Sequence, residues 1–551
     1  MANFFDTVIE VLKQDERFFS EEGELLRNTV YESAMKMDSD LLKLLYNNEM
    51  TRERFFTDVD GISVFDKVGF GWVINNRQFL PDSYTRYKNK IGLTNGNGDY
   101  ISTSNDVELV FPYKDCVLAG GQTKEDQNRS EIFYNETLAP DEVDRLLYPK
   151  VFTNAKRYTT NGKEEIVEFN ENDNLIIKGN NLLVLASLLK RFEGKIKCVY
   201  IDPPFNTQKD DFKYNDNFNH STWLSFMRNR LMIAKKLLAP DGSIFVHLDF
   251  HESHYAKILM DEIFGRECFR NNIVWCYTGP SGSNNFLPRK HDDILYYSKT
   301  ENNKYHIQYI EHKSGVHNSG QVFGSTDVID NFKAEAEQKG KKLEDFWLDI
   351  YSTDRYRSEM LGFAGQKPEK LIQRILNIST DENDIVLDFH LGSGTTAAVA
   401  HKMKRKYICV EQMESQIELS IDRLINVIDG EQTGISKDVD WQGGGSFVYC
   451  ELAKLNQKYV DGIQTATNDS EIVSIWEEML KTGFISCKVK PSEIDMEDTD
   501  FLELSLDDKK RFLMEMLDKN QLYVNYCDIE DETFAVSEAD KAFTKSFYGG
   551  M

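Results

Sequence analysis

From about residue 173 onward, the chain alternates short apolar runs with stretches in which apolar residues recur every three or four positions. The first pattern is typical of buried strands and the second of amphipathic helices. Strands are predicted at residues 196–201, 243–248, 272–277, 293–298, 385–389 and 407–410. Helices are predicted at residues 221–238, 253–264 and 368–377, from 395 onward and at 414–427, with Pro240, Asp241 and Gly242 stopping the first. This alternation predicts a doubly wound, mostly parallel α/β sheet.

The remaining regions have other patterns. Residues between Phe18 and Leu44 have helical spacing, while Gly61 to Val73 alternates like a strand. Residues 300–362 have weak periodicity and many polar residues, which indicates an insertion. We therefore predict five parts: an N-terminal accessory domain at 1–150, two halves of the α/β domain at 151–299 and 363–430, the insertion at 300–362, and a C-terminal region at 431–551.

The composition indicates a large folded protein. Of its 551 residues, 40% are apolar and 12% aromatic, too many for a disordered chain. The eight cysteines include no C-x-x-C pair, so we expect neither a disulfide scaffold nor a metal site. No apolar run approaches the roughly 18 residues of a membrane span, and the first residues lack the pattern of a signal peptide. We expect a soluble, cytoplasmic protein without a membrane partner.

The net charge of −26 argues against nonspecific binding of nucleic acid by the whole surface. Half of this charge comes from residues 431–551, which hold 25 Asp or Glu and 12 Lys or Arg. The rest of the chain can therefore still carry local basic patches.

A glycine-containing segment follows the strand at 385–389 and precedes the helix that begins at 395. It reads Asp388, Phe389, His390, Leu391, Gly392, Ser393, Gly394 and Thr395. Glycines allow a ligand to approach the backbone, and a helix N-terminus offers unpaired N–H groups. Glu411 ends the next strand and is suited to accept hydrogen bonds from two ribose hydroxyls. This segment predicts a nucleoside-bearing cofactor, which by itself could equally be a nicotinamide or flavin dinucleotide.

A second motif, Asp202, Pro203, Pro204 and Phe205, follows the strand at 196–201. Prolines have no N–H donor, so the carbonyls and the Asp202 carboxylate form a set of acceptors without a competing donor. Two acceptors aimed at the N–H bonds of an exocyclic base amine would pull its lone pair out of the aromatic ring. The ring of Phe205 offers a face on which the base can stack. The motif therefore predicts chemistry on the amine of a nucleobase.

Together these motifs resemble the S-adenosylmethionine-dependent amino methyltransferases of DNA, in the motif order of the permuted β group. Further segments resemble the modification (Mod) subunits of type III restriction–modification systems. They lie at residues 242–249, 366–371, 405–411, 446–451 and 522–526. The resemblance implies adenine-N6 methylation, with S-adenosylmethionine as cofactor and double-stranded DNA as substrate. Two departures are Phe205, where the family often has Tyr, and the pair His390–Leu391; we expect His390 to be structural.

The resemblance also implies roles for individual residues. The methionine carboxylate of the cofactor is expected near Lys367, Ser393 and Thr395, its amino group at Asp388, and its ribose at Glu411. The target base must be flipped out of the duplex. Candidate DNA contacts near the motifs are Lys209, Lys213, Tyr214, Arg289 and Lys290, with Arg228 and Arg230 as further basic residues. Sequence recognition is expected in the insertion.

Three alternatives remain open at this stage. Cytosine-N4 methylation would use the same acceptors, and a nicotinamide oxidoreductase would use the same glycine segment. A DNA-binding specificity subunit with an inactive site would need neither motif intact. The chain has no Walker A pattern, so ATP-driven cleavage is expected from a separate restriction (Res) subunit. The acidic C-terminal region is a candidate for forming a homodimer or docking that subunit.

Overall fold

The computed structural model divides the chain into two compact units, Met1–Pro112 and Tyr113–Met551. It describes residues 4–19, 25, 27–59, 62–74, 93–94, 108–109, 117–119, 132–134, 146–207, 220–277, 285, 287–310, 340–363, 365–486, 491, 494, 496, 498–518 and 521–549. In these residues no helix has the length and apolarity that crossing a bilayer requires. The predicted division into five parts stays a prediction.

The first unit is mainly helical. Its elements are α1 (Phe4–Leu12), α2 (Arg27–Met35), α3 (Ser39–Asn47), α4 (Glu49–Phe55), β1 (Phe56–Val59), β2 (Ile62–Phe65), α5 (Lys67–Ile74), β3 (Leu93–Thr94) and β4 (Glu108–Leu109). The strand predicted from Gly61 to Val73 is wrong in its second half, which is α5. The reason is a helix cap: the Asp66 carboxylate accepts from the N–H of Gly69 at 2.8 Å, and Phe70 and Ile74 are buried one turn apart.

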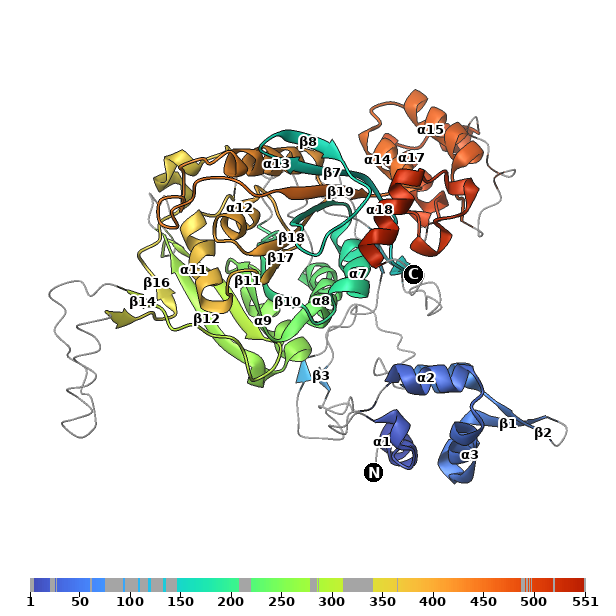
Figure 1. Cartoon of the computed structure of the whole chain (residues 1–551). Coiled ribbons are helices and arrows are strands. Elements are labelled where there is room, and N and C mark those ends of the chain that lie inside the picture. The colour runs from blue at the N-terminus through green and yellow to red at the C-terminus, as the bar shows by residue number, and fades with distance from the viewer. Residues whose placement is uncertain are drawn as a thin grey trace, which may run out of the picture. The chain divides into compact units, whose positions relative to one another are not determined.

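The second unit is built on an eleven-stranded sheet with the order β16-β12-β13-β11-β10-β17-β18-β9-β19-β7-β8 (Figure 1). The strands are β7 (Phe152–Thr159), β8 (Gly162–Glu165), β9 (Leu175–Lys178), β10 (Ile196–Ile201), β11 (Leu238–Leu248), β12 (Phe269–Cys276), β13 (His291–Ser298), β16 (Phe346–Trp347), β17 (Ile385–Asp388), β18 (Lys406–Glu411) and β19 (Phe447–Leu452). The run from β11 to β19 is parallel, and antiparallel pairs extend it at both edges. This confirms the predicted mostly parallel α/β fold.

Helices cover both faces of the sheet. They are α7 (Asn181–Phe192), α8 (His220–Leu237), α9 (Ser253–Phe264), α11 (Glu369–Ser379), α12 (Thr395–Lys402) and α13 (Glu414–Ile428). The crossovers through α7 and α8 run along the sheet toward β11, whereas those through α12 and α13 run toward β19. Right-handed crossovers in opposite directions place their helices on opposite faces. The direction reverses between the neighbouring strands β10 and β17, and open α/β sheets bind ligands at such a reversal.

Several predicted boundaries change in the structure. Pro240, Asp241 and Gly242 do not form a separate turn but lie within β11, where the pairing with β10 shifts register. The side chain of Asp241 pairs with Lys197 on β10, and the carbonyl of Gly242 accepts from the N–H of Lys299 at 2.9 Å. These contacts hold the segment in the sheet after α8 ends at Leu237.

The described ends of the predicted insertion pack on the same sheet. β16 pairs with β12, and Trp347 at its end is buried in the main hydrophobic cluster. Lys304 donates to Asp384 just before β17, at 2.9 Å. A further small pair, β14 (Tyr309–Ile310) and β15 (Lys341–Lys342), joins the two ends. Residues 311–339, at the centre of the insertion, lie outside the described residues.

The C-terminal region has two parts. α14 (Gln457–Thr465), α15 (Asp469–Thr482), α16 (Thr499–Leu502) and α17 (Leu506–Met516) surround a separate core that contains Ile463 and Met479. The last helix, α18 (Glu538–Tyr548), returns to β7, where Phe547 packs on Phe152 with ring centroids 4.6 Å apart. Only the first part is therefore a separate structural lobe.

Candidate functional site

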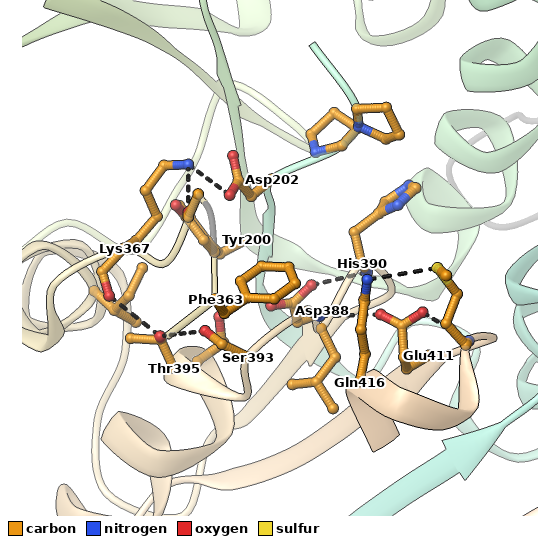
Figure 2. A pocket seen from close by; sticks show the side chains of 18 of the residues that line it. Tyr200, Asp202, Phe363, Lys367, Asp388, His390, Ser393, Thr395, Glu411 and Gln416 are labelled. Atoms are coloured by element: carbon orange, nitrogen blue, oxygen red, sulfur yellow. Dashed lines mark hydrogen bonds and ion pairs between the residues drawn. The ribbon is translucent and has the colours of Figure 1, made fainter. Parts of the chain in front are cut away.

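An open pocket of about 830 Å³, solvent included, lies at the carboxyl ends of β10, β17 and β18 (Figure 2). It is at the reversal point of the sheet, because Asp202 follows β10 and Asp388 ends the adjacent β17. Its lining includes residues of both motifs: Asp202, Pro203, Pro204, Phe205, Lys367, Asp388, Gly392, Ser393, Thr395 and Glu411. Two segments almost two hundred residues apart in the sequence thus meet in one site.

The Asp202 carboxylate uses only one of its oxygens within the described residues. Its Oδ2 accepts a hydrogen bond from the Lys367 ammonium at 2.6 Å, and Figure 2 shows the two side chains joined. Its Oδ1 is buried and has no hydrogen-bond partner there. Leaving a buried acceptor unpaired costs about 1–3 kcal/mol. Such an atom is suited to accept a hydrogen bond from a ligand.

The carbonyls of the two prolines differ, which corrects the prediction of acceptors without a competing donor. The indole Nε1 of Trp223, in α8, donates to the Pro204 carbonyl at 2.8 Å. Trp223 is fully buried, so this donor is fixed. Within the described residues, the Pro203 carbonyl therefore remains as the backbone acceptor beside Asp202.

The end of the motif is held by a buried carboxylate. Asn206 has a positive φ of 60°, and its Nδ2 donates to Glu252 Oε1 at 2.5 Å. Phe205 itself contacts two polar groups. The Lys367 ammonium is 4.9 Å from its ring centroid, and the His247 ring is stacked on it at 5.9 Å with planes 27° apart. The backbone and the ring of this motif are thus both fixed by tertiary contacts.

The glycine segment needs its glycines for conformation and for close packing. Gly392 and Gly394 have φ of 55° and 77°, a region that L-residues seldom adopt. A Cβ at Gly394 would lie 3.1 Å from the side chain of Ser420, whose hydroxyl donates to the Gly392 carbonyl at 2.9 Å. The loop is therefore bound to α13 on one side and open to the pocket on the other.

Two buried carboxyl groups face this loop. Burial raises the pKa of Asp388 to about 7, and the nearby negative charges of Asp202 and Glu411 act in the same direction. Hydrogen bonds from Thr396 and from the His390 N–H lower this pKa, but by less. Burial also raises the pKa of Glu411, although its oxygens accept from the N–H groups of Gly392, Gln412 and Met413 at 2.8–3.0 Å. Both groups are acceptors in a site of low polarity, which favours a cationic or hydroxyl-bearing ligand.

A buried ionic network supports the loop from below, and the sequence did not indicate it. Glu369 accepts from Lys402 at 2.9 and 3.0 Å and from Arg423 at 3.0 Å. Glu369 keeps its charge despite burial, because these cations hold its pKa below the usual range. Arg423 also donates to the Thr395 hydroxyl at 2.8 Å. The Thr395 hydroxyl in turn donates to the Lys367 carbonyl at 3.2 Å. The hydroxyl proton of Thr395 is therefore committed within the protein.

Other predicted residues lie apart from the pocket. Phe389 is fully buried and does not line it; its carbonyl accepts from Asn181 at 2.9 Å. Gly394 also lies behind the lining. His390 does line the pocket, and burial lowers its pKa well below the usual value, so its ring is uncharged. The expectation that His390 is structural stays a prediction.

A family model described as "DNA methylase" matches residues 196–422, and one described as "Type III restriction/modification enzyme methylation subunit" matches residues 38–93. The chain is 34% identical to the "Probable type III restriction-modification enzyme HindVI Mod subunit" of Haemophilus influenzae, over 98% of this chain and 97% of that protein. The chain belongs to the Mod subunits of type III restriction–modification systems. The EcoP15I Mod subunit of Escherichia coli is 31% identical over 37% of this chain and 36% of its own. The M1.HpyAVI–SAM crystal structure has 17% identity and a TM-score of 0.31, and covers 45% of this chain and 99% of its own.

Membership of the Mod family confirms the resemblance seen in the sequence. The protein is an S-adenosylmethionine-dependent DNA methyltransferase of the adenine-N6 type, and DNA and a Res subunit are the partners that this family implies. The alternatives of a nicotinamide oxidoreductase and of cytosine-N4 methylation are wrong. The glycine segment alone suggested the first, because dinucleotide and S-adenosylmethionine sites both need a tight strand-to-helix turn.

The predicted DNA contacts of the Mod subunit are only partly described. Lys209, Lys213 and Tyr214 lie outside the described residues. Arg289 and Lys290 precede β13, and the Arg289 guanidinium lies 3.7 Å from the ring centroid of Phe250. Their contact with DNA stays a prediction. Arg230, named as a further basic residue, is instead buried in α8.

The guanidinium of Arg230 donates to Asn181 at 2.7 Å, and burial lowers its pKa to about 9. It links α8 to α7 and is only 6% exposed, so we no longer expect it to contact a phosphate.

Sequence reasoning missed six residues that line the pocket. They are Tyr200, Phe363, Gly365, Ile372, Met413 and Gln416. Tyr200 could have been found, because it lies two residues before Asp202 on the same strand. Phe363 follows the insertion, where weak periodicity gave no signal, and it lies 3.5 Å from the position that a Cβ on Gly392 would take.

Proposed function

We propose that this Mod subunit methylates adenine in duplex DNA with the flipped base held by Asp202, Pro203 and Phe205. The observation that supports this best is the buried Asp202 Oδ1, which has no partner in the described residues and lies in a pocket shared with the glycine loop. A base amine that donates to Oδ1 would remove the cost of the unpaired acceptor. The same amine would have the Pro203 carbonyl as its second acceptor.

The residues present fit S-adenosylmethionine. The cofactor supplies an electrophilic methyl group on a cationic sulfur. The loop at Gly392 leaves space that a Cβ would fill beside Phe363, and the N-terminus of α12 begins at Thr395. Asp388 is an acceptor for the amino group and Glu411 for the ribose hydroxyls, in agreement with their burial beside the loop.

The carboxylate of the cofactor needs donors. The Ser393 hydroxyl is one, since it lies 3.3 Å from Thr395 and has no stronger commitment in the described residues. Thr395 takes a supporting role because its proton is bound to the Lys367 carbonyl. Lys367 is the remaining candidate, and to reach a cofactor it would exchange the Asp202 carboxylate for another anion.

Asp202 is then an orienting group for the amine. As the methyl group arrives, the amine nitrogen gains positive charge, which a preorganised carboxylate stabilises. Phe205 holds the base plane by stacking, worth about 1–3 kcal/mol. The chain's contribution is positioning and electrostatics, and no covalent intermediate with the protein is required.

Two further features belong to this proposal. The first is that the Mod subunit forms a homodimer on DNA. The second is that the lobe of α14–α17 docks either the second copy or the Res subunit. The acidic composition of residues 431–551 supports a protein partner for this lobe over a DNA contact.

The test is single-turnover methylation of duplex DNA by Asp202→Ala. Transfer should fall by at least about 10²-fold, as when one preorganised polar group is removed. Binding of S-adenosylmethionine should persist, which titration calorimetry measures. Asp429→Ala, an exposed residue at the end of α13, is the matched control. Retention of most activity by Asp202→Ala would refute the assignment.

A further inference from the structure

A line of hydrogen-bonded side chains crosses four neighbouring strands behind Phe205. Tyr277 follows β12, Asp292 lies on β13, His247 on β11 and Tyr200 on β10, which is the order of these strands in the sheet. The Tyr277 hydroxyl donates to Asp292 Oδ1 at 3.0 Å, Asp292 Oδ2 is 3.1 Å from His247 Nε2, and His247 Nδ1 is 3.0 Å from the Tyr200 hydroxyl.

The donors and acceptors of this line have one consistent assignment. Burial opposes ionisation of Asp292, but the hydrogen bonds from His247 and Tyr277, together with the charge of Lys367, hold the pKa of Asp292 below its usual range. Burial raises the pKa of Tyr200 well above its usual value, so its phenol keeps its proton. Asp292 therefore accepts from both sides, and Tyr200 donates to Nδ1 of a His247 ring that carries its proton on Nε2. Both ring nitrogens of His247 are occupied.

His247 meets the target-base platform directly. Its ring is fully buried and stacks on Phe205 at 5.9 Å with planes 27° apart, while the edge of Trp275 packs against it at 5.5 Å and 87°. A ring bonded at both nitrogens cannot turn about its own axis without breaking a hydrogen bond, whereas an apolar ring in that space could. Tyr200, at the other end of the line, reaches the pocket beside Asp202 (Figure 2).

We propose that His247 is a positioning residue for methyl transfer: held by Asp292 and Tyr200, it sets the orientation of the Phe205 ring on which the target adenine stacks. The inference rests on the proposed function, since it requires that Phe205 contacts the base. It explains why three polar side chains are buried and a fourth, Tyr277, is half-buried at one sheet edge, where each must be paired to avoid a desolvation cost. A completely paired line rigidifies its members more than apolar packing does.

Three variants test the role of the line. His247→Phe keeps a ring but removes both hydrogen bonds, and Asp292→Asn and Tyr200→Phe change single groups with little change in volume. We expect the single-turnover rate on duplex DNA to fall about 10- to 100-fold in His247→Phe, the range in which small misplacements of reacting groups act. Affinity for S-adenosylmethionine should stay within about twofold, because no hydrogen bond joins the line to the glycine loop among the described residues.

The fluorescence of 2-aminopurine at the target position measures how firmly the base stacks, which a loss of folding stability alone would not change. A base that stacks firmly on Phe205 is quenched, so His247→Phe should give a brighter signal in the complex with the full-length protein. Tyr297→Phe is the matched control. Tyr297 is a buried tyrosine on β13, and its hydroxyl donates to an aspartate, Asp261, at 2.6 Å. Its ring packs against Phe264 and Phe269 and does not line the pocket.

A double-mutant cycle with Phe205→Ala decides between the outcomes. If His247 acts through Phe205, then His247→Phe should cause little further loss in the Phe205→Ala background. Full additivity, or an unchanged rate in His247→Phe, would overturn the inference. If His247→Phe does not fold, the same cycle with Asp292→Asn gives the answer. Failure of the proposed function has a different signature, because Phe205→Ala alone would then leave transfer unchanged.

Discussion

The affinity of this Mod subunit for its cofactor should depend on pH through Asp388. This carboxyl is 2% exposed, and burial raises its pKa to about 7. The amino group proposed to bind there is a cation, so binding favours the ionised form. Affinity should therefore fall as pH drops below 7, with the uptake of one proton by the free protein.

The size of this pH effect on affinity follows from the fraction of Asp388 that is ionised. With a pKa of about 7, roughly half of Asp388 is ionised at pH 7 and about 3% at pH 5.5, which predicts about 15-fold weaker binding at the lower pH. Titration calorimetry across pH 5.5–7 measures this slope. Repeating it in buffers with different ionisation enthalpies measures the proton released on binding. Asp388→Asn should bind more weakly at pH 7, and its affinity should vary less with pH.

The same group affects stability in the opposite sense. Its folded pKa lies above the unfolded value of about 4, so its stabilising effect is complete below pH 4 and is lost as pH rises through 7. By pH 8 the buried charge costs up to roughly 4 kcal/mol. Asp388→Asn should thus raise the unfolding midpoint of the free protein at pH 8 and much less at pH 5, while Asp429→Asn should do neither. Equal pH slopes for the two proteins in both assays would refute the reasoning.

Variants at three positions test the site further. Phe205→Tyr keeps the stacking face and should retain activity within several-fold, whereas Phe205→Ala should lose roughly 1–3 kcal/mol of base stabilisation. Because a mismatch lowers the cost of flipping the base, the single-turnover defect of Phe205→Ala should be smaller on a mismatched duplex. Equal defects on matched and mismatched duplexes would contradict this. Lys367→Met removes the charged hydrogen bond to Asp202 and should lower the free energy of unfolding in urea by about 1.5–3 kcal/mol, with Lys367→Arg restoring part of it. Glu369→Gln leaves Arg423 buried without its counter-ion and Lys402 with Glu431 alone, and should cost about 3–5 kcal/mol in the same assay. A loss below 1 kcal/mol would show that the network relaxes.

The elements of the α/β domain could be predicted because central parallel strands are buried on both faces and appear as continuous apolar runs. β10 matches its prediction residue for residue, and the ends of β17 and β18 differ by only one or two. Both motifs follow such strands, so their meeting at one edge could also be expected. The start of α5 was missed because a cap depends on one side chain, Asp66, and not on periodicity.

The partners of each site residue could not be predicted. Trp223 takes the Pro204 carbonyl from nineteen residues away, and Lys367 reaches Asp202 across 165 residues. Glu369 was part of a segment that resembled the family, but nothing in the pattern of charges showed that its carboxylate would be buried with two cations. These contacts depend on how separate elements pack, which a single sequence does not encode in any local pattern.

The charges of the pocket connect binding with stability. Three carboxyl groups line the pocket, those of Asp202, Asp388 and Glu411. The negative charges of Asp202 and Glu411 contribute to the raised pKa of Asp388. Among the described residues that line the pocket, Lys367 is the single Lys or Arg. The free protein thus carries an excess of acidic groups that a cationic ligand relieves. A cofactor with two positive centres therefore gains affinity from repulsion already present in the empty site, at the expense of stability in the free protein. On the proposed contacts, the carboxylate of the cofactor would give Lys367 an alternative partner, and Asp202 would then be free for the amine of the base; we therefore expect the cofactor to bind before the base.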